Sequence, residues 1–255
     1  MIENRIGPFG AVRDKSDERD LVYTPSATSL PKSVDIRAHC GPCYDQMPLQ
    51  SCSAHAVGSA ITWLANHAGA PIPAPSRLFL YYNARRIEGT QATDSGATMR
   101  NAIKSIARDG TCPETDWPYD TTQFATQPPQ RCYDDATVHA VSYRRLDRTL
   151  DAMRSCLAEG YPFVFAMEAY AQPFTAASSN GGHLAMPAAG DTLCGGHAVL
   201  AVGYDDYQET VAVLNSLGPT FGADGYFTMP YAYFTEPNLT YDLWTVRKIE
   251  ASPRA

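Results

Sequence analysis

The sequence predicts an α+β fold, with a mainly helical half over residues 32–135 and a mainly antiparallel β half over residues 136–255. Apolar residues recur every three or four positions through most of the first half, which is the period of an amphipathic helix. From about residue 136 the pattern changes to short β-rich runs separated by turn residues. Hydrophobic residues make up 44% of the chain, which is ample for a core.

Three helices are expected in the first half. The first follows Ser51, a natural N-cap residue, and stops before Gly69. The second covers residues 76–88, and the third covers residues 98–109 and ends at Gly110. In the second half, one more helix should stop at Gly160, and five strands are expected at 163–167, 198–204, 210–217, 225–229 and 244–249.

Cys52 is the first candidate for a functional residue. The pattern of residues 45–56 places it in the first turn of the first helix. Unpaired backbone N–H groups and the positive end of the helix dipole favour the thiolate there, and the thiolate is the nucleophilic form. The alternative is that Cys52, one of seven cysteines, packs as a small hydrophobic side chain.

The residues downstream favour the functional interpretation. His197 stands at the head of an apolar strand, 145 positions after Cys52, and Asn215 follows at the end of the next strand. This order and spacing, with Val34-Asp35-Ile36-Arg37 and Gln46 upstream and Asp224-Gly225-Tyr226 downstream, resembles the papain-type cysteine peptidases. The resemblance implies a papain-like fold, in which the helical half and an antiparallel, β-barrel-like half meet at an active-site cleft.

The same resemblance implies a mechanism and its residues. Cys52 would attack a peptide carbonyl as the thiolate, and His197 would stabilise that thiolate and protonate the leaving amine. Asn215 would hold the imidazole ring, while the Gln46 amide and the Cys52 backbone N–H would face the oxyanion. No metal or organic cofactor is expected. Two alternatives stay open: Gln50 as the oxyanion donor and His55, one helical turn from Cys52, as the base.

The resemblance also points to substrate-binding residues. Gly96 and Ser95 match the glycine pair that hydrogen-bonds the substrate backbone like an added strand. Ala166 and Gly195 would line the subsite for the side chain two positions before the scissile bond, and Gly196 is grouped with them. Because these residues are small, we expect a roomy pocket for a bulky apolar side chain.

Several positions depart from the family pattern. Leu217 and Phe221 replace two tryptophans, the first of which normally screens the His–Asn contact, so that contact is expected to be wetter and weaker. Met47 and Gln50 replace glycines, and Ser53 replaces a tryptophan. These losses leave two other functions open: an inactive, papain-shaped binding module, and a thiol hydrolase acting on non-peptide or isopeptide acyl groups.

Residues 1–31 are expected to stand apart as a pro-like segment and linker. Residues 6–10 form a short apolar patch, whereas seven of the nine residues from 12 to 20 are charged, which is typical of a solvated linker. Papain-like enzymes carry N-terminal prosegments that block the cleft. We therefore expect residues 2–10 to lie in or near the cleft as an inhibitory segment, the alternative being a disordered leader without a role.

Composition limits the partners further. A formal charge of −7 and a pI near 5.3 provide no basic surface for nucleic acid or anionic lipid. No apolar run is long enough to span a membrane and no signal peptide is visible, so the compartment stays open. The expected partner is a peptide or protein substrate. Cys40 and Cys43 have thioredoxin-like spacing without the βαβ context, and Cys112 could pair with Cys132.

Overall fold

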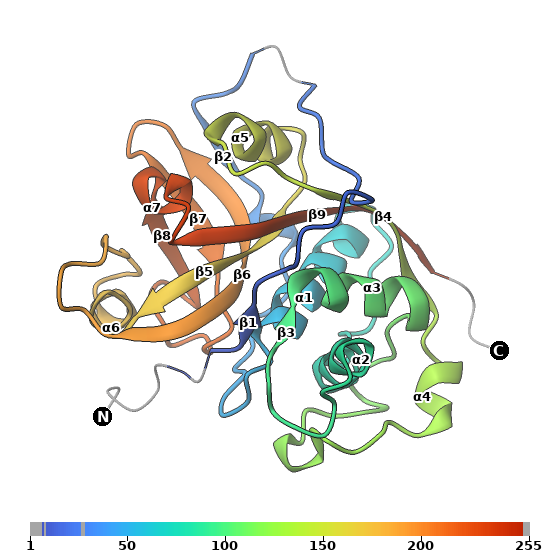
Figure 1. Cartoon of the computed structure of the whole chain (residues 1–255). Coiled ribbons are helices and arrows are strands. Elements are labelled where there is room, and N and C mark those ends of the chain that lie inside the picture. The colour runs from blue at the N-terminus through green and yellow to red at the C-terminus, as the bar shows by residue number, and fades with distance from the viewer. Residues whose placement is uncertain (1–6, 8, 27–28, 252–255) are drawn as a thin grey trace.

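The computed structural model describes residues 7, 9–26 and 29–251. Helices gather on one side of the molecule and a curved antiparallel sheet lies on the other (Figure 1). Three further helices pack against the sheet. The helices are α1 (Cys52–His67), α2 (Arg77–Glu88), α3 (Met99–Asp109), α4 (Gln130–Asp134), α5 (Leu150–Ala158), α6 (Ala171–Ser179) and α7 (Tyr231–Thr235), with two short 3-10 turns at Arg37–His39 and Thr121–Gln123.

The main sheet has seven strands, in the order β4-β9-β5-β6-β7-β8, with β2 paired to β6. All of its pairings are antiparallel. The strands are β2 (Ser33–Asp35), β4 (Val138–Arg145), β5 (Phe163–Tyr170), β6 (Leu193–Asp205), β7 (Thr210–Leu214), β8 (Tyr226–Pro230) and β9 (Thr240–Ala251). Because β2 comes from residues before α1, the first half of the chain also contributes to the sheet.

The helix starts follow local capping chemistry in two of the three predicted cases. The hydroxyl of Ser76 accepts a hydrogen bond from the Phe79 N–H, and that of Thr98 does the same for α3. Ser51 precedes α1 as expected, but its side chain makes no capping bond. Its hydroxyl lies instead 2.5 Å from the Tyr119 hydroxyl, so the start of α1 is tied to the loop after α3.

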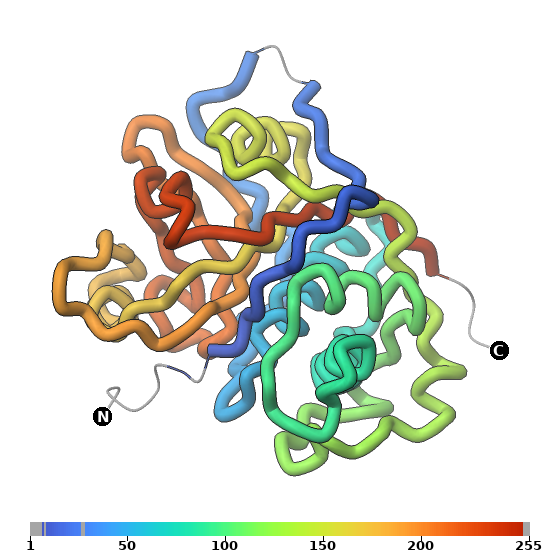
Figure 2. The backbone as a smooth tube through the Cα atoms, in the orientation of Figure 1, coloured from blue at the N-terminus to red at the C-terminus, as the bar shows by residue number. Residues whose placement is uncertain are grey.

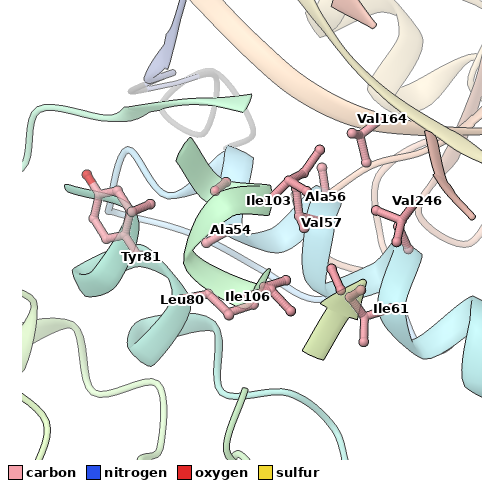
Figure 3. Close-up of a cluster of buried hydrophobic side chains, with 14 of the residues drawn as sticks. Ala54, Ala56, Val57, Ile61, Leu80, Tyr81, Ile103, Ile106, Val164 and Val246 are labelled. Atoms are coloured by element: carbon pink, nitrogen blue, oxygen red, sulfur yellow. The ribbon is translucent and has the colours of Figure 1, made fainter. Parts of the chain in front are cut away.

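One apolar cluster joins the helices to the sheet. Figure 3 shows Val57 and Ile61 of α1 beside Ile103 of α3, with Val164 and Val246 reaching toward them from β5 and β9. All five side chains are buried, and packing of this kind holds each element in a fixed position. A second cluster lies on the other face of the sheet, under α5, α6 and α7.

The N-terminal strap, defined here as residues 9–20, runs between the helical side and the sheet (Figure 2). Its strand β1 (Ala11–Val12) pairs in parallel with β3 (Ala97–Thr98). Residues 12–20, expected to form a solvated linker, are mostly exposed, but some of their charged side chains bind the body of the protein. The Asp20 carboxylate pairs with the Arg100 guanidinium at 2.6 Å, and the Trp244 indole N–H donates to Asp14 at 2.8 Å. These charges are matched by partners on the body of the protein.

The cysteines are all unbridged. Cys112 and Cys132 are nevertheless close enough for their thiols to interact, as the possible pairing required. Burial raises the pKa of Cys40 to about 11 and that of Cys43 to about 12, which disfavours the thiolates that redox exchange needs. Within the described residues, no helix is both long and apolar enough to cross a membrane, and no group of three metal-binding side chains occurs.

Candidate active site

Cys52 is the first residue of α1, and its side chain is fully buried. Backbone N–H groups of Gly10, Ala198 and Ser53 face the sulfur and favour the thiolate, as the position at the helix start predicts. Burial outweighs them and raises the pKa of the thiol. Part of this burial comes from the strap, to which Gly10 belongs.

His197 lies near the start of β6, with both of its ring nitrogens buried. Its Nε2 is 2.7 Å from Oδ1 of Asn215. The same oxygen accepts the Ser216 N–H at 2.8 Å, which identifies it as the amide oxygen. Because an amide oxygen only accepts, Nε2 carries the proton in this contact and neutral His197 keeps Nδ1 as a free base.

Nδ1 of His197 has no hydrogen-bond partner among the described residues. The next residue along β6, Ala198, directs its N–H toward the sulfur of Cys52. Gly10 also faces that sulfur, and the adjacent strap residue, Phe9, stacks on the His197 ring. The thiol and the imidazole therefore border the same short stretch of strap. Burial lowers the pKa of His197 to about 4.

Gln46 is fully buried, and its amide is held from both ends. Its Oε1 accepts from the Ser216 hydroxyl at 2.6 Å, and its Nε2 donates to the carbonyl of Leu49 at 3.1 Å. One amide N–H remains for another acceptor. Since Ser216 follows Asn215 directly, this contact connects the cysteine loop to the strand end that orients His197.

The two alternative residues are occupied elsewhere. The Gln50 amide donates to the backbone carbonyl of Asp94 at 2.7 Å, and its backbone N–H donates to the Asp94 carboxylate at 3.1 Å. The His55 ring packs edge-on against Tyr119, with Nδ1 at 3.1 Å from the Ser51 carbonyl. Burial lowers the pKa of His55 to about 3. Both side chains are thus engaged by residues other than Cys52.

The predicted substrate-binding residues surround the strap. The carbonyl of Gly10 accepts a hydrogen bond from Ala97, next to Gly96, at 3.0 Å. A side chain at Gly195 would touch the backbone of Phe9, and one at Gly196 would overlap the carbonyl of Ala11. Ser95 turns its hydroxyl to Thr90 at 3.0 Å, while Ala166 is buried in β5 opposite Ala198.

The His197–Asn215 contact is dry in this structure, contrary to the expectation drawn from the missing tryptophans. His197 is fully buried and Asn215 is 4% exposed. Leu217 and Phe221 are themselves buried, and Phe174 of α6 packs edge-on against the His197 ring. Sequence analysis missed Phe174, Ser216 and Tyr241. The apolar patch that contains Phe9 was noted in the sequence, but its contact with the His197 ring was not predicted.

Comparison with known proteins agrees with this geometry. Residues 30–239 match the family described as papain family cysteine protease. The chain belongs to the papain family of cysteine proteases. It is also 32% identical, over 94% of its length and 87% of the relative, to an uncharacterised peptidase C1-like protein of Acanthamoeba polyphaga mimivirus.

Solved structures of papain-family proteins share the fold. Xylellain, a cysteine protease from Xylella fastidiosa, is 37% identical, with 96% of each chain covered and a TM-score of 0.86. A procathepsin B from Trypanosoma congolense is 18% identical, with 96% of this chain and 87% of that chain covered and a TM-score of 0.76, and supports the fold alone. The papain-like α+β fold and cysteine peptidase activity predicted from the sequence are thereby confirmed, with peptides or proteins as substrates.

Proposed function

We propose that Cys52, His197, Asn215 and Gln46 carry out peptide hydrolysis in this papain-family enzyme. The observation that carries the proposal is the 2.7 Å contact between Nε2 of His197 and Oδ1 of Asn215. It fixes the tautomer that leaves Nδ1 free as a base, beside a cysteine at the start of a helix. The contacts of Gly10 with Cys52 and of Phe9 with His197 support placing the nucleophile and the base close together, as activation of a thiol requires.

The reaction follows from these atoms. Nδ1 of His197 first takes the thiol proton, which gives a thiolate–imidazolium ion pair. The Cys52 thiolate then attacks the substrate carbonyl carbon, and the carbonyl electrons move to the oxygen. The remaining Gln46 amide N–H and the Cys52 N–H stabilise that oxyanion. His197 then gives its proton to the leaving amine, which leaves a thioester on Cys52. Water, deprotonated by His197, releases the acid and restores the thiol.

The strap is proposed to hold the enzyme closed. Gly10 directs its N–H at the Cys52 sulfur, Phe9 covers the His197 ring, and Ala11 pairs with Ala97 of β3. These contacts support the inhibitory segment expected at residues 2–10, of which residues 2–6 and 8 lie outside the described residues. With the strap in place, burial favours the neutral thiol and imidazole, so both access and the ion pair are suppressed.

The division at residue 135 also remains a proposal. In it, residues 32–135 position the nucleophile and residues 136–255 position His197 and Asn215. The core cluster that joins α1 and α3 to β5 and β9 supports the idea that the two parts fold as one body. The contact between Gln46 and Ser216 is a further link between them.

Labelling with iodoacetamide tests the site. The full-length chain should be alkylated at Cys52 ahead of its other cysteines once the strap opens, and hydrolysis of a fluorogenic peptide should be lost in parallel. Replacement of Cys52 by Ala should abolish both signals, whereas Cys156→Ala, which alters another buried thiol, should leave the labelling pattern intact. Hydrolysis of esters or isopeptides without cleavage of peptides would favour the alternative hydrolase, and labelling of Cys52 with no hydrolysis would favour the binding module.

A further inference from the structure

The side chain of Arg13 in the strap occupies a site made by the sheet. One of its terminal nitrogens lies 2.9 Å from the Glu168 carboxylate and 3.5 Å from the backbone carbonyl of Asn238. Its guanidinium carbon lies 3.7 Å from the centre of the Tyr241 ring. A carboxylate, a carbonyl and an aromatic face are the three kinds of group that bind a guanidinium.

This site belongs to the active-site region. Glu168 of β5 lies opposite Gly196, the residue before His197 on β6. Tyr241 of β9 lies opposite Ala166, and its hydroxyl faces Gly196. Arg13 follows Gly10, the residue over the Cys52 sulfur, by three positions along the strap. A peptide bound along Gly96 and β3 would therefore place a side chain here about two or three residues from the bond it presents to Cys52.

The groups of the site are held by the sheet rather than by Arg13. The Glu168 N–H donates to the Leu239 carbonyl at 2.9 Å, and its own carbonyl accepts from the Tyr233 hydroxyl. The side chain of Glu168 is 18% exposed and Tyr241 is 6% exposed. Arg13 itself is half exposed. When Arg13 leaves, a carboxylate carried by this fixed backbone, beside a buried aromatic ring, loses its cation.

We infer that Glu168, Tyr241 and the Asn238 carbonyl form a substrate subsite selective for arginine, on the β3 side of Cys52. The inference rests on the proposed function, since it assumes that substrate replaces the strap over Cys52. Arginine is favoured over lysine because only a planar guanidinium stacks on the ring while donating to two acceptors. The strap then blocks the enzyme partly by imitating the side chain that the subsite selects.

The subsite departs from the sequence-based expectation. Ala166 and Gly195 are small, which predicted a roomy apolar pocket, but Tyr241 lies over the first of them and the strap backbone over the second. The side chains that neighbour these small residues on the sheet include a carboxylate, Glu168, and a phenol ring, Tyr241. A cation with a flat apolar surface suits these neighbours better than a bulky aliphatic side chain does.

Matched peptides test this inference on the full-length chain. The variant carrying both Phe9→Ala and Arg13→Ala loosens the strap without removing any part of the chain. It is assayed with peptide pairs that carry arginine or its neutral isostere citrulline, two or three residues before the scissile bond in one set and two or three residues after it in another. At one of these positions kcat/KM should favour arginine by about tenfold, the combined effect of a partly buried ion pair and a cation–π contact.

Adding Glu168→Gln to that variant should bring the arginine-to-citrulline ratio close to one. Glu250→Gln removes the same charge from the exposed end of β9, where Glu250 pairs with Lys248, and should leave the ratio unchanged. Equal hydrolysis of both peptides before Glu168 is changed would overturn the subsite while leaving the proposed function intact. No hydrolysis of either, together with unlabelled Cys52, would overturn both.

Discussion

The ring of Phe9 stacks on the ring of His197, with their centroids 4.2 Å apart and their planes at 38°. Phe9 is 6% exposed and also packs against Phe174 at 5.6 Å. A buried aromatic side chain therefore holds the strap directly against the proposed catalytic base. The imidazole cannot meet substrate or water on that face until Phe9 moves.

Replacement of Phe9 by Ala should activate the full-length enzyme. Loss of a buried phenylalanine costs roughly 3–5 kcal/mol in protein cores, and here most of that loss falls on the closed state. We expect the initial rate of peptide hydrolysis to rise by at least about tenfold, since each 1.4 kcal/mol shifts an equilibrium tenfold. Stopped-flow or plate-reader assays from the moment of mixing measure this rate.

Leu21→Ala is the matched control for Phe9. Leu21 lies in the same N-terminal region but is 60% exposed, so its truncation removes little buried surface. Its initial rate should equal that of the unmodified chain. If Phe9→Ala and Leu21→Ala behave alike, the strap does not inhibit through Phe9.

Ser216 should matter to catalysis only through Gln46. Removing the Gln46 amide should lower kcat roughly 10²–10³-fold, the usual effect of losing one oxyanion donor. Ser216→Ala removes the hydroxyl that donates to Gln46 at 2.6 Å and should lower kcat less, by about fivefold, as expected for one neutral hydrogen bond. The double variant should match Gln46→Ala alone. Additive losses would show that Ser216 acts independently of Gln46.

Acidification should open the strap through His197. Burial in the closed form lowers the pKa of His197 to about 4, and exposure returns it toward 6.5. Between pH 4 and pH 6.5 the open form binds a proton on His197 that the closed form does not. The contribution of His197 to the stability of the closed form, relative to the open form, is therefore fully present above pH 6.5 and is lost as the pH falls toward 4. The gain in opening is at most tenfold per pH unit.

Comparison with His197→Gln isolates this effect. Burial also raises the pKa of Asp242 to about 6, and its carboxylate accepts the Asp14 N–H of the strap at 2.6 Å. The closed form therefore holds a proton on the Asp242 carboxyl up to a higher pH than the open form does. Protonation of Asp242 favours closure in acid and opposes the effect of His197. Hydrogen exchange of residues 9–14, corrected for intrinsic rates, should therefore increase more between pH 7 and pH 4.5 in the unmodified chain than in His197→Gln. Identical pH profiles would contradict the role of His197.

The elements that carry Cys52, His197 and Asn215 were accessible from sequence because each has a strong local pattern. Cys52 begins a helical repeat, His197 lies within β6 directly before its apolar run, and Asn215 follows β7. The three longer helices of the first half were predicted to within a few residues for the same reason, whereas the short helix α4 was not predicted. Local periodicity placed each residue on its element, while the family resemblance supplied both the expectation that they meet and their roles.

The strap could not be placed from local patterns. Residues 12–20 have the composition of a solvated linker, yet Asp20 pairs with Arg100, eighty positions away in the sequence. Such a pairing has no periodic signal, because it depends on where the helical part and the sheet come together. The raised pKa of Cys52 was missed for the same reason, since the strap contributes to burying it.

Gly96→Ala should separate access to Cys52 from binding of a peptide. Gly96 has φ +71°, and a methyl group there would overlap the Gly10 carbonyl, so the variant expels both the strap and any peptide strand laid along β3. Iodoacetamide needs no strand pairing and should label Cys52 faster than in the unmodified chain. Peptide hydrolysis should instead show a KM raised by about tenfold or more. Gly89→Ala, which also has a positive φ but open space around it, controls for backbone strain. Unchanged labelling together with unchanged KM would show that neither strap nor substrate runs along Gly96.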